Sequence, residues 1–429
     1  MATSTQLRQR IAAGEWDPKL RALYGNTEQE LCRQRARYCA ALEQFELYFG
    51  PGRQVQVYSA PGRAELGGNH TDHQHGYGLA AAVTLDLVAV AAHNTDGYVR
   101  VKSRGFNKLD VIDLTVAGPQ EGEGTHSASL IRGIAEGFRA VGKTVGGFDA
   151  YTASDVLRGS GLSSSAAFEM GMAVIWNGEY DCGLAPTELA KICQYAENTY
   201  FGKPSGLLDQ LTSAVGGIIF ADFADPASPQ IEKIHTDGLL PPGMSLCVTD
   251  TRGSHSELTS EFAAIRKEME QVAGTLGKKV LGQVTESEFW AALPELRSKC
   301  GDRAVLRAIH YFEENTRTLA QRDALQAGRF AAFAALVLES GRASFALCQN
   351  VYCSTDVRHQ GLSVALALSQ CILQGSGAWR MQGGGFAGTI QAYVPKELLE
   401  RYHSEIERVF GAGSCYVLRL REQGAVRVG

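Results

Sequence analysis

A seven-residue segment rich in glycine and serine, followed at once by an apolar run, constrains this chain most. Residues 159–165 read Gly-Ser-Gly-Leu-Ser-Ser-Ser, and the run Ala166 to Asn177 has the composition of a buried helix. Glycine lets a backbone pass close to an anion, and the free N–H groups and dipole of a helix N-terminus favour negative charge. The segment therefore suits phosphate binding, although a glycine turn with serine helix caps explains it equally well. The residues concerned are Gly159, Ser160, Gly161, Leu162, Ser163, Ser164 and Ser165.

The length of the chain predicts two domains. A chain of 429 residues exceeds the usual size of one compact core. The stretch from Asp225 to Pro242 holds four of the 12 prolines and is the best candidate for a junction. We therefore expect an N-terminal domain over 1–225, with a helical extension over 1–50, and a C-terminal domain over 226–429.

Hydrophobic patterning predicts strands and helices in both halves. Strands are expected at 54–59, 80–92, 98–103, 148–156, 216–223, 245–250, 389–394 and 415–420. Helices are expected at 28–49, 127–141, 166–177, 187–200, 256–274, 286–296, 303–327, 330–340 and 363–373. The tetrapeptide Asn94-Thr95-Asp96-Gly97 is typical of a hairpin turn.

Charge and cysteine usage narrow the function classes. The net charge of −5 disfavours nucleic acid as the main partner. The ten cysteines form no CxxC pair and no Cys/His zinc spacing, so free thiols in a reducing cytoplasm are expected. No apolar leader opens the chain, and the most apolar stretch, Leu79 to Ala92, contains Asp86 and is too short for a bilayer. We expect a cytoplasmic protein with no membrane partner, whose oligomeric state the sequence leaves open.

Three further segments accompany the serine loop. Gly62 to His73 reads GRAELGGNHTDH, Leu208-Asp209-Gln210 follows Glu197, and Gly383 to Thr389 reads GGGFAGT. Together with GLSSSA, these motifs resemble in order and spacing those of the GHMP small-molecule kinases, and within them the galactokinases. The resemblance covers about residues 45 to 395. It implies an α+β, two-domain GHMP kinase fold: an N-terminal α/β domain with a ribosomal-protein-S5-like core, a C-terminal α+β domain, and an active site in the cleft between them.

The resemblance also implies roles for individual residues. Asp209 would accept the proton of a sugar C1 hydroxyl as that oxygen attacks the γ-phosphate of ATP, with Arg63 beside it. Ser165 and Glu197 match the family's Mg²⁺ ligands. The sugar-binding positions correspond to Asn69, His70, Thr71, Asp72 and Phe262. The Gly383–Gly388 loop is expected to pack against the active site or the nucleotide loop, or to be a structural turn.

The sugar end departs from the family pattern. The signature is approximately GRVNLIGEHTDY, so Glu65 stands where it has asparagine, Asn69 where it has glutamate and His73 where it has tyrosine. Phe262 replaces the tyrosine of the family's SEYxxRR segment. A neutral residue 69 removes a repulsion against anionic sugars, and His73-Gln74 resembles the plant galacturonokinases.

Several functions therefore remain open. The leading expectation is ATP-dependent phosphorylation of galactose at C1, with a related sugar such as galacturonic acid as the alternative acceptor. A non-catalytic sugar and ATP sensor is a second class, disfavoured by the complete serine loop and by Asp209. A GHMP kinase of mevalonate, homoserine or an inositol is a third, disfavoured by His70-Thr71-Asp72.

Overall fold

The computed structural model describes residues 2–156, 161–235, 240–253, 258–354 and 356–429. The strands are β1 (Ala2–Thr3), β2 (Gln54–Gly67), β3 (Tyr77–His93), β4 (Tyr98–Ser103), β5 (Leu109–Asp113), β6 (Phe148–Ser154), β7 (Ile218–Asp222), β8 (Gln230–Ile234), β9 (Met244–Asp250), β10 (Ala378–Gln382), β11 (Thr389–Pro395), β12 (Cys415–Leu418) and β13 (Val426–Arg427). The helices are α1 (Ser4–Ala12), α2 (Asp17–Tyr24), α3 (Glu28–Phe49), α4 (Ser127–Ala140), α5 (Ser164–Glu179), α6 (Pro186–Ala196), α7 (Leu208–Val215), α8 (Thr259–Thr275), α9 (Glu286–Ala291), α10 (Leu293–Cys300), α11 (Asp302–Gln326), α12 (Phe330–Ala343), α13 (Gly361–Leu373) and α14 (Lys396–Phe410).

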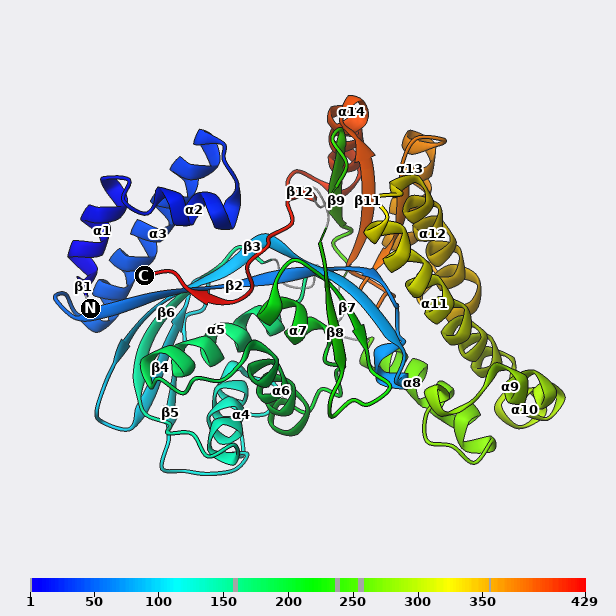
Figure 1. The fold of residues 1–429 in the computed structure, drawn as a ribbon, viewed down its shortest axis with the longest axis horizontal. Coiled ribbons are helices and arrows are strands. Elements are labelled where there is room, and N and C mark those ends of the chain that lie inside the picture. Colours follow the sequence, from blue (N-terminus) through cyan, green and yellow to red (C-terminus); the bar gives the residue numbers. More distant parts are fainter. Residues whose placement is uncertain (1, 157–160, 236–239, 254–257, 355) are drawn as a thin grey trace.

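A large, mainly antiparallel sheet is built around β3. This long strand pairs with β2, β6 and β7, while β4 and β5 extend the sheet beyond β6. Its side chains alternate between two cores: Leu87 and Ala89 face one, Val88 and Val90 the other. Figure 1 shows α4–α7 covering the first face and α1–α3 covering the second. Because both faces are covered, the apolar run of β3 is nearly continuous.

A smaller sheet forms the second half. Its strand order is β10-β11-β9-β12, and α11, α12 and α13 lie beside it (Figure 1). The long helix α11 also contacts β2 and β3 of the large sheet, so it joins the two halves. This contact brings the turn after β2 against the C-terminal half, where the candidate site lies.

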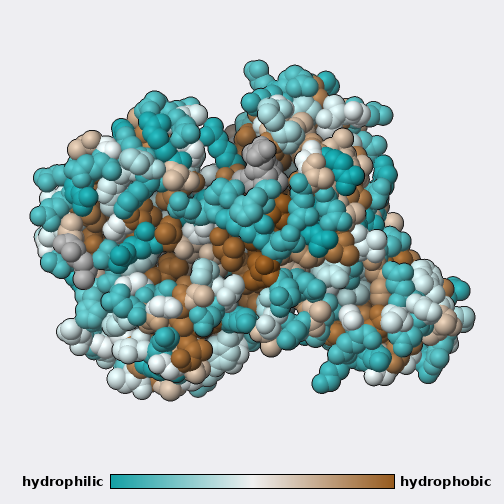
Figure 2. Space-filling model, viewed as in Figure 1, coloured by the Kyte–Doolittle hydropathy of each residue, from teal (hydrophilic) through white to brown (hydrophobic). Residues whose placement is uncertain are grey.

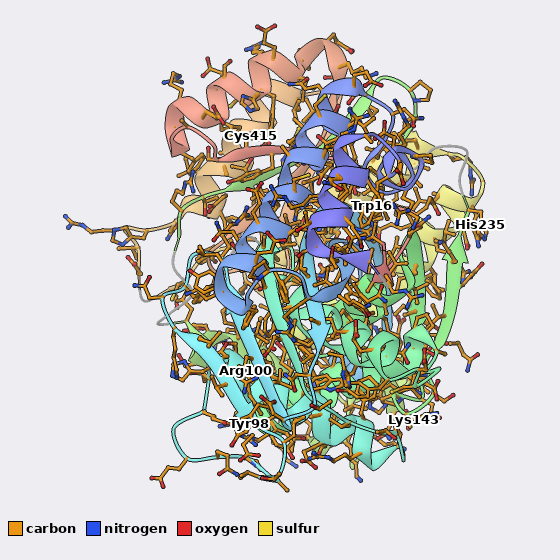
Figure 3. The ribbon with its side chains drawn as sticks, turned by 90° about the vertical axis from the view of Figure 1, so that its left-hand side faces the viewer. Trp16, Tyr98, Arg100, Lys143, His235 and Cys415 are labelled. Carbon is orange, nitrogen blue, oxygen red and sulfur yellow. The ribbon has the colours of Figure 1, made fainter. Side chains whose placement is uncertain are left out.

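The two chain ends meet on the large sheet. Helices α1–α3 lie across it with Trp16 among them (Figure 3), and β13 pairs with β2. The carboxylate of Asp86 on β3 is fully buried and pairs with Arg37 from α3 and Arg421 from the C-terminal tail. A buried charge of this kind needs such partners, so this cluster fixes the helical extension and the tail to the same strand.

Several sequence expectations differ from the observed elements. The Asn94–Gly97 turn does not form a hairpin, because β6 lies between β3 and β4 in the sheet. The helix expected at 286–296 is two helices, since Pro294 in the first turn of α10 cannot continue α9. Helix α14 was not predicted, although its Tyr402 and Ile406 are buried.

The expected junction at 225/226 cuts the large sheet. Strand β8 lies beyond residue 225 yet pairs with β7, and β13 near the C-terminus pairs with β2. Backbone pairing between distant segments cannot be seen in local composition. The division into domains at that residue remains a proposal.

The surface is mostly hydrophilic, with hydrophobic side chains gathered toward the middle of the face in Figure 2. Within the described ranges, one helical stretch, Phe330–Cys348, is long and apolar enough by composition to cross a membrane. Its Phe333 and Val337 are buried in the main core, as in a core helix of a folded domain. All ten cysteines are free thiols, as expected.

Candidate active site

Most of the predicted site residues lie around one cavity of about 520 Å³, whereas Leu162, Thr71 and Glu197 do not line it. It is lined by segments from both halves: the end of β2 and the turn after it, the serine loop, the start of α7, the start of α8 and the Gly383–Gly384 turn. Arg63, Asn69, His70, Asp72, Gly161, Ser163, Ser164, Ser165, Asp209 and Phe262 all line it. Motifs separated by more than 300 residues therefore form one site.

Arg63 and Asp209 line the cavity and form a pair joined by two hydrogen bonds. The Arg63 Nε and Nη2 atoms donate to the two carboxylate oxygens of Asp209 at 2.7 and 2.9 Å. Ser163 donates its hydroxyl to the same carboxylate, and Arg63 Nη1 donates to the Gly161 carbonyl. Burial alone would raise the pKa of Asp209, but the Arg63 charge and the Ser163 hydrogen bond lower it. Asp209 is therefore an ionised acceptor at neutral pH.

The serine loop leads into α5 with its helix N-terminus at the cavity. Ser163 has a positive φ of 57° and precedes the first helical residue, Ser164. Ser164 and Ser165 line the cavity, whereas Leu162 is fully buried in the main core and does not. Gly159 and Ser160 lie outside the described residues. The free N–H groups of the first turn of α5 suit an anion here.

A buried acidic cluster adjoins the loop. Gln210 Nε2 donates to both Glu169 (3.0 Å) and Glu197 (2.9 Å). Glu169 follows Ser165 by four residues on α5, so the two share a helix face. Burial and the charge of Glu197 raise the pKa of Glu169 well above its ordinary value. Glu197 also accepts from Ser205 and from Lys203, whose Nζ lies 2.7 Å from Glu197 Oε1.

Asp72 is the second carboxylate of the cavity. It lies in the short helical turn Asp72–Gln74 and accepts from the backbone of His73 at 2.8 Å. Burial, and then the charge of Asp209, raise the pKa of Asp72 to about 6. A Cβ added at Gly206 would overlap the Asp72 carboxylate, so a larger residue there would displace that side chain. Asp72 and the loop before α7 are thus in direct contact.

Asn69 lies at the cavity wall, but its amide is occupied by protein. Its Nδ2 donates to Gly383 O (2.7 Å) and to Glu65 Oε1 (3.1 Å), and its Oδ1 accepts from Asn350 (2.9 Å). Glu65 in turn pairs with the buried Arg380 at 2.7 Å. The two positions at which asparagine and glutamate are exchanged relative to the signature are therefore in contact with each other.

His70 and Phe262 bring the glycine-rich turn to the site. His70 Nε2 lies 3.0 Å from the Gly384 carbonyl, and burial lowers the pKa of His70 to about 4. The Phe262 ring packs edge-on against Phe386, with centroids 5.4 Å apart. The Gly383–Gly388 loop thus packs against the active site. Of the two alternatives predicted for it, packing against the site or a purely structural turn, this is the first.

Thr71 does not join the cavity. It is fully buried, and its hydroxyl donates to the Gly68 carbonyl at 2.8 Å, which closes the turn after β2. The Thr71 hydroxyl, bonded to the backbone, shapes the turn, and the sugar-binding role expected for Thr71 stays a prediction.

Helix α11 forms hydrogen bonds with the turn that follows β2. Glu314 accepts from the backbone N–H groups of Gly68 (3.3 Å) and Asn69 (3.4 Å) and from Ser340 Oγ (2.7 Å). His310 Nε2 lies 2.9 Å from the Asn69 carbonyl oxygen. Burial alone would raise the pKa of Glu314. Its interactions with His310, Arg380 and Arg317 outweigh burial and lower the pKa to about 2.

Sequence reasoning missed Lys203, Glu314 and the Glu65–Arg380 pair. Lys203 lies between Glu197 and Asp209 in the sequence. Its closeness to two carboxylates already predicted for the site could have indicated that it belongs there too. Glu314, Arg317 and His310 are spaced at three or four residues on a predicted helix, which places them on one face. Their partner, the turn at Gly68–Asn69, is some 245 residues away and leaves no local trace.

Two family profiles match segments that contribute residues to the cavity. The profile of the GHMP kinases N terminal domain matches residues 129–217, and the galactokinase galactose-binding signature matches residues 43–93. A galactokinase of Streptomyces coelicolor is 32% identical over 371 residues, covering 85% of this chain and 91% of that protein.

Solved structures share the fold. The galactokinase of Lactococcus lactis complexed with galactose has a TM-score of 0.78 at 24% identity, covering 90% of this chain and 98% of that one. The mevalonate kinase of Methanococcus jannaschii has a TM-score of 0.60 at 16% identity, covering 86% and 99%. The two-domain α+β architecture expected from the motifs is therefore confirmed.

Proposed function

The chain belongs to the galactokinases of the GHMP kinase family, and on that premise we propose that it transfers the γ-phosphate of ATP to the C1 hydroxyl of galactose. The products are galactose 1-phosphate and ADP. The observation that carries the proposal is the Arg63–Asp209 pair, which lines one cavity together with the serine loop and Asp72.

Asp209 is the proposed catalytic carboxylate. As the C1 oxygen bonds to the γ-phosphorus, the bond from phosphorus to the β,γ-bridging oxygen breaks and ADP leaves. The hydroxyl proton passes to Asp209, and Arg63 holds the carboxylate in place by two hydrogen bonds. Arg63 also places positive charge next to the reacting oxygens, where negative charge develops.

The nucleotide phosphates are assigned to the serine loop and the N-terminus of α5. Ser163, Ser164 and Ser165 supply hydroxyl groups at the cavity wall. The chemistry of the donors fits Mg²⁺, because Glu197 offers a carboxylate beside the helix face that carries Ser165, and Mg²⁺ keeps several waters. Ser165 and Glu197 would hold the ion, which would neutralise phosphate charge when bound.

The sugar is assigned to the side of the cavity formed by Asp72, His70 and Phe262. Asp72 can accept hydrogen bonds from sugar hydroxyls, and Phe262 offers an apolar ring face. Asn69 would act through the Gly383–Gly384 turn that it holds, since its amide is already bonded there. A cytoplasmic location for this small-molecule kinase is also part of the proposal.

A coupled ADP-release assay tests the function. We expect turnover of galactose, with galacturonate, N-acetylgalactosamine, glucose and arabinose compared in the same assay. Faster turnover of galacturonate than of galactose would replace the proposed acceptor. No turnover of any of the five, in a folded protein that binds ATP, would contradict a sugar 1-kinase.

A further inference from the structure

We propose that Lys203 is a binding residue for the γ-phosphate: it pairs with Glu197 in the absence of nucleotide and moves onto the phosphate when Mg²⁺ takes up Glu197. The inference rests on the proposed kinase function and adds a residue that the family motifs do not contain. It begins from one contact, the 2.7 Å ion pair between Lys203 Nζ and Glu197 Oε1.

The two partners of this pair differ greatly in exposure. The Lys203 side chain is 55% exposed, whereas that of Glu197 is 2% exposed. Lys203 lines the cavity together with Ser163, Ser164 and Ser165. Its ammonium group therefore reaches from solvent across the cavity wall to the carboxylate that we assign to Mg²⁺. A lysine on a flexible four-carbon stem can change partners without moving the backbone.

Glu197 can release the lysine without becoming an unsatisfied buried charge. Its Oε2 keeps the hydrogen bonds from Gln210 Nε2 (2.9 Å) and Ser205 Oγ, while Lys203 holds only Oε1. The Lys203 backbone N–H donates to the Glu197 carbonyl at 3.0 Å, so the loop stays attached when the side chain moves. A cation at Oε1 would thus displace the ammonium group and leave the rest of the cluster in place.

The positively charged side chains that line the cavity are mostly engaged with other protein groups, so a further cation is useful for neutralising the transferred phosphate. Among the described residues that line it, the cations are Arg63, Lys203 and Arg266. Arg63 is bound through all three guanidinium nitrogens to Asp209 and Gly161, and Arg266 Nε donates to Glu270 (2.7 Å). Phosphoryl transfer depends on neutralising the transferred group, and Lys203 lines the same cavity as the serine loop and has a partner, Glu197, that a metal ion could take over.

The test compares nucleotide binding in the full-length wild type, K203M and K203R by titration calorimetry. With excess Mg²⁺ we expect K203M to bind ATP about tenfold more weakly, the usual effect of losing one charge-assisted hydrogen bond. ADP, which lacks the γ-phosphate, should bind within about twofold of wild type, and K203R should retain most of the ATP affinity. K299M is the matched control, because Lys299 is similarly exposed (61%), pairs with Glu295 at 2.6 Å and does not line the cavity.

Three results would overturn the proposal. Unchanged ATP affinity in K203M would show that the lysine does not contact the γ-phosphate. Tighter MgATP binding, or saturation at lower Mg²⁺, would show that Lys203 only competes with the ion for Glu197. An equal loss of ATP and ADP affinity would also count against the proposal. Thermal melts of each variant show whether a loss of affinity comes from unfolding. These readouts need no turnover, so a failure to phosphorylate galactose contradicts the proposed function and leaves this measurement valid.

Discussion

The guanidinium group of Arg63 and the carboxylate of Asp209 face each other in a parallel, two-point hydrogen bond, with N–O distances of 2.7 and 2.9 Å. Arg63 comes from β2 and Asp209 from the first turn of α7, 146 residues later. Such a bidentate pair fixes the orientation of both side chains more firmly than one contact would. The carboxylate is therefore held in a fixed orientation at the cavity wall before any substrate enters.

Neutralising this carboxylate should abolish turnover while sparing nucleotide binding. We expect D209N to lower kcat by about 10³-fold, because the amide cannot accept the hydroxyl proton. ATP affinity, measured by calorimetry, should stay within a few-fold, since the phosphates are assigned to the serine loop. D323N, at an exposed site on α11, is the control and should behave as wild type.

The same variant separates a kinase from a sensor. A protein that only binds sugar and ATP would release no ADP, either as wild type or as D209N. Wild-type turnover that persists in D209N within tenfold would remove Asp209 from the proton transfer and require another acceptor.

Glu65 and Asn69 should behave as one unit. In N69E a second carboxylate would stand against Glu65, where an amide now donates at 3.1 Å, and the bond to Gly383 O would be lost. Burying such a charge without a partner costs about 3 kcal/mol, so thermal melts should show a clear loss of stability. The double variant E65N/N69E restores an amide–carboxylate pair but takes the Glu65 carboxylate away from Arg380, so it should recover only part of that loss. A double-mutant cycle showing simple additivity would contradict the coupling.

These two positions illustrate what the sequence could and could not predict. The motifs alone identified Arg63, Asp72, Ser165 and Asp209 and placed them in one cleft, because each motif combines glycine, charge and order along the chain. They presented Glu65 and Asn69 as two separate departures. Their contact joins residues only four apart, but the bonds that hold it, from Arg380 to Glu65 and from Asn350 to Asn69, come from chain segments 315 and 281 residues away. Packing of that range, like the insertion of β6 between β3 and β4, leaves no local pattern.

Glu314 is expected to position the turn that carries the sugar-binding residues. E314Q should raise KM for the sugar more than KM for ATP and should destabilise the protein by about 3 kcal/mol, since Arg317 loses a buried partner. E313Q is the matched control: Glu313 is half-exposed and lies 3.4 Å from the same arginine.

The pH dependence of the Glu314 effect follows from its lowered pKa. The folded-state pKa is about 2, below the ordinary value of 4.5, so the stabilisation is fully present above about pH 4.5 and is lost as pH falls toward 2. The gap in unfolding free energy between wild type and E314Q should therefore be constant near neutrality and shrink below pH 4.5. A gap that widened in acid would contradict this assignment.

Asp72 should make sugar binding sensitive to pH near 6. Its pKa is raised to about 6 by burial and by the charge of Asp209, and only the ionised form accepts hydrogen bonds through both oxygens. KM for the sugar should therefore rise as pH falls from 7 to 5, by about tenfold for each unit well below 6, while KM for ATP changes little. Initial rates at varied sugar and fixed, saturating ATP measure this.

The stability of the protein should respond to Asp72 in the opposite sense. Because the folded-state pKa lies above the ordinary 3.8, the folded protein holds this proton more tightly, and stability falls as pH rises from about 4 to about 6. D72N removes the buried charge, so its melting temperature should exceed that of wild type by about 2 °C at pH 8 and by less at pH 5. It should also bind sugar poorly at every pH. If D72N is less stable than wild type at pH 8, the charged carboxylate is stabilised by favourable contacts. The assignment of a raised pKa to Asp72 would then be wrong.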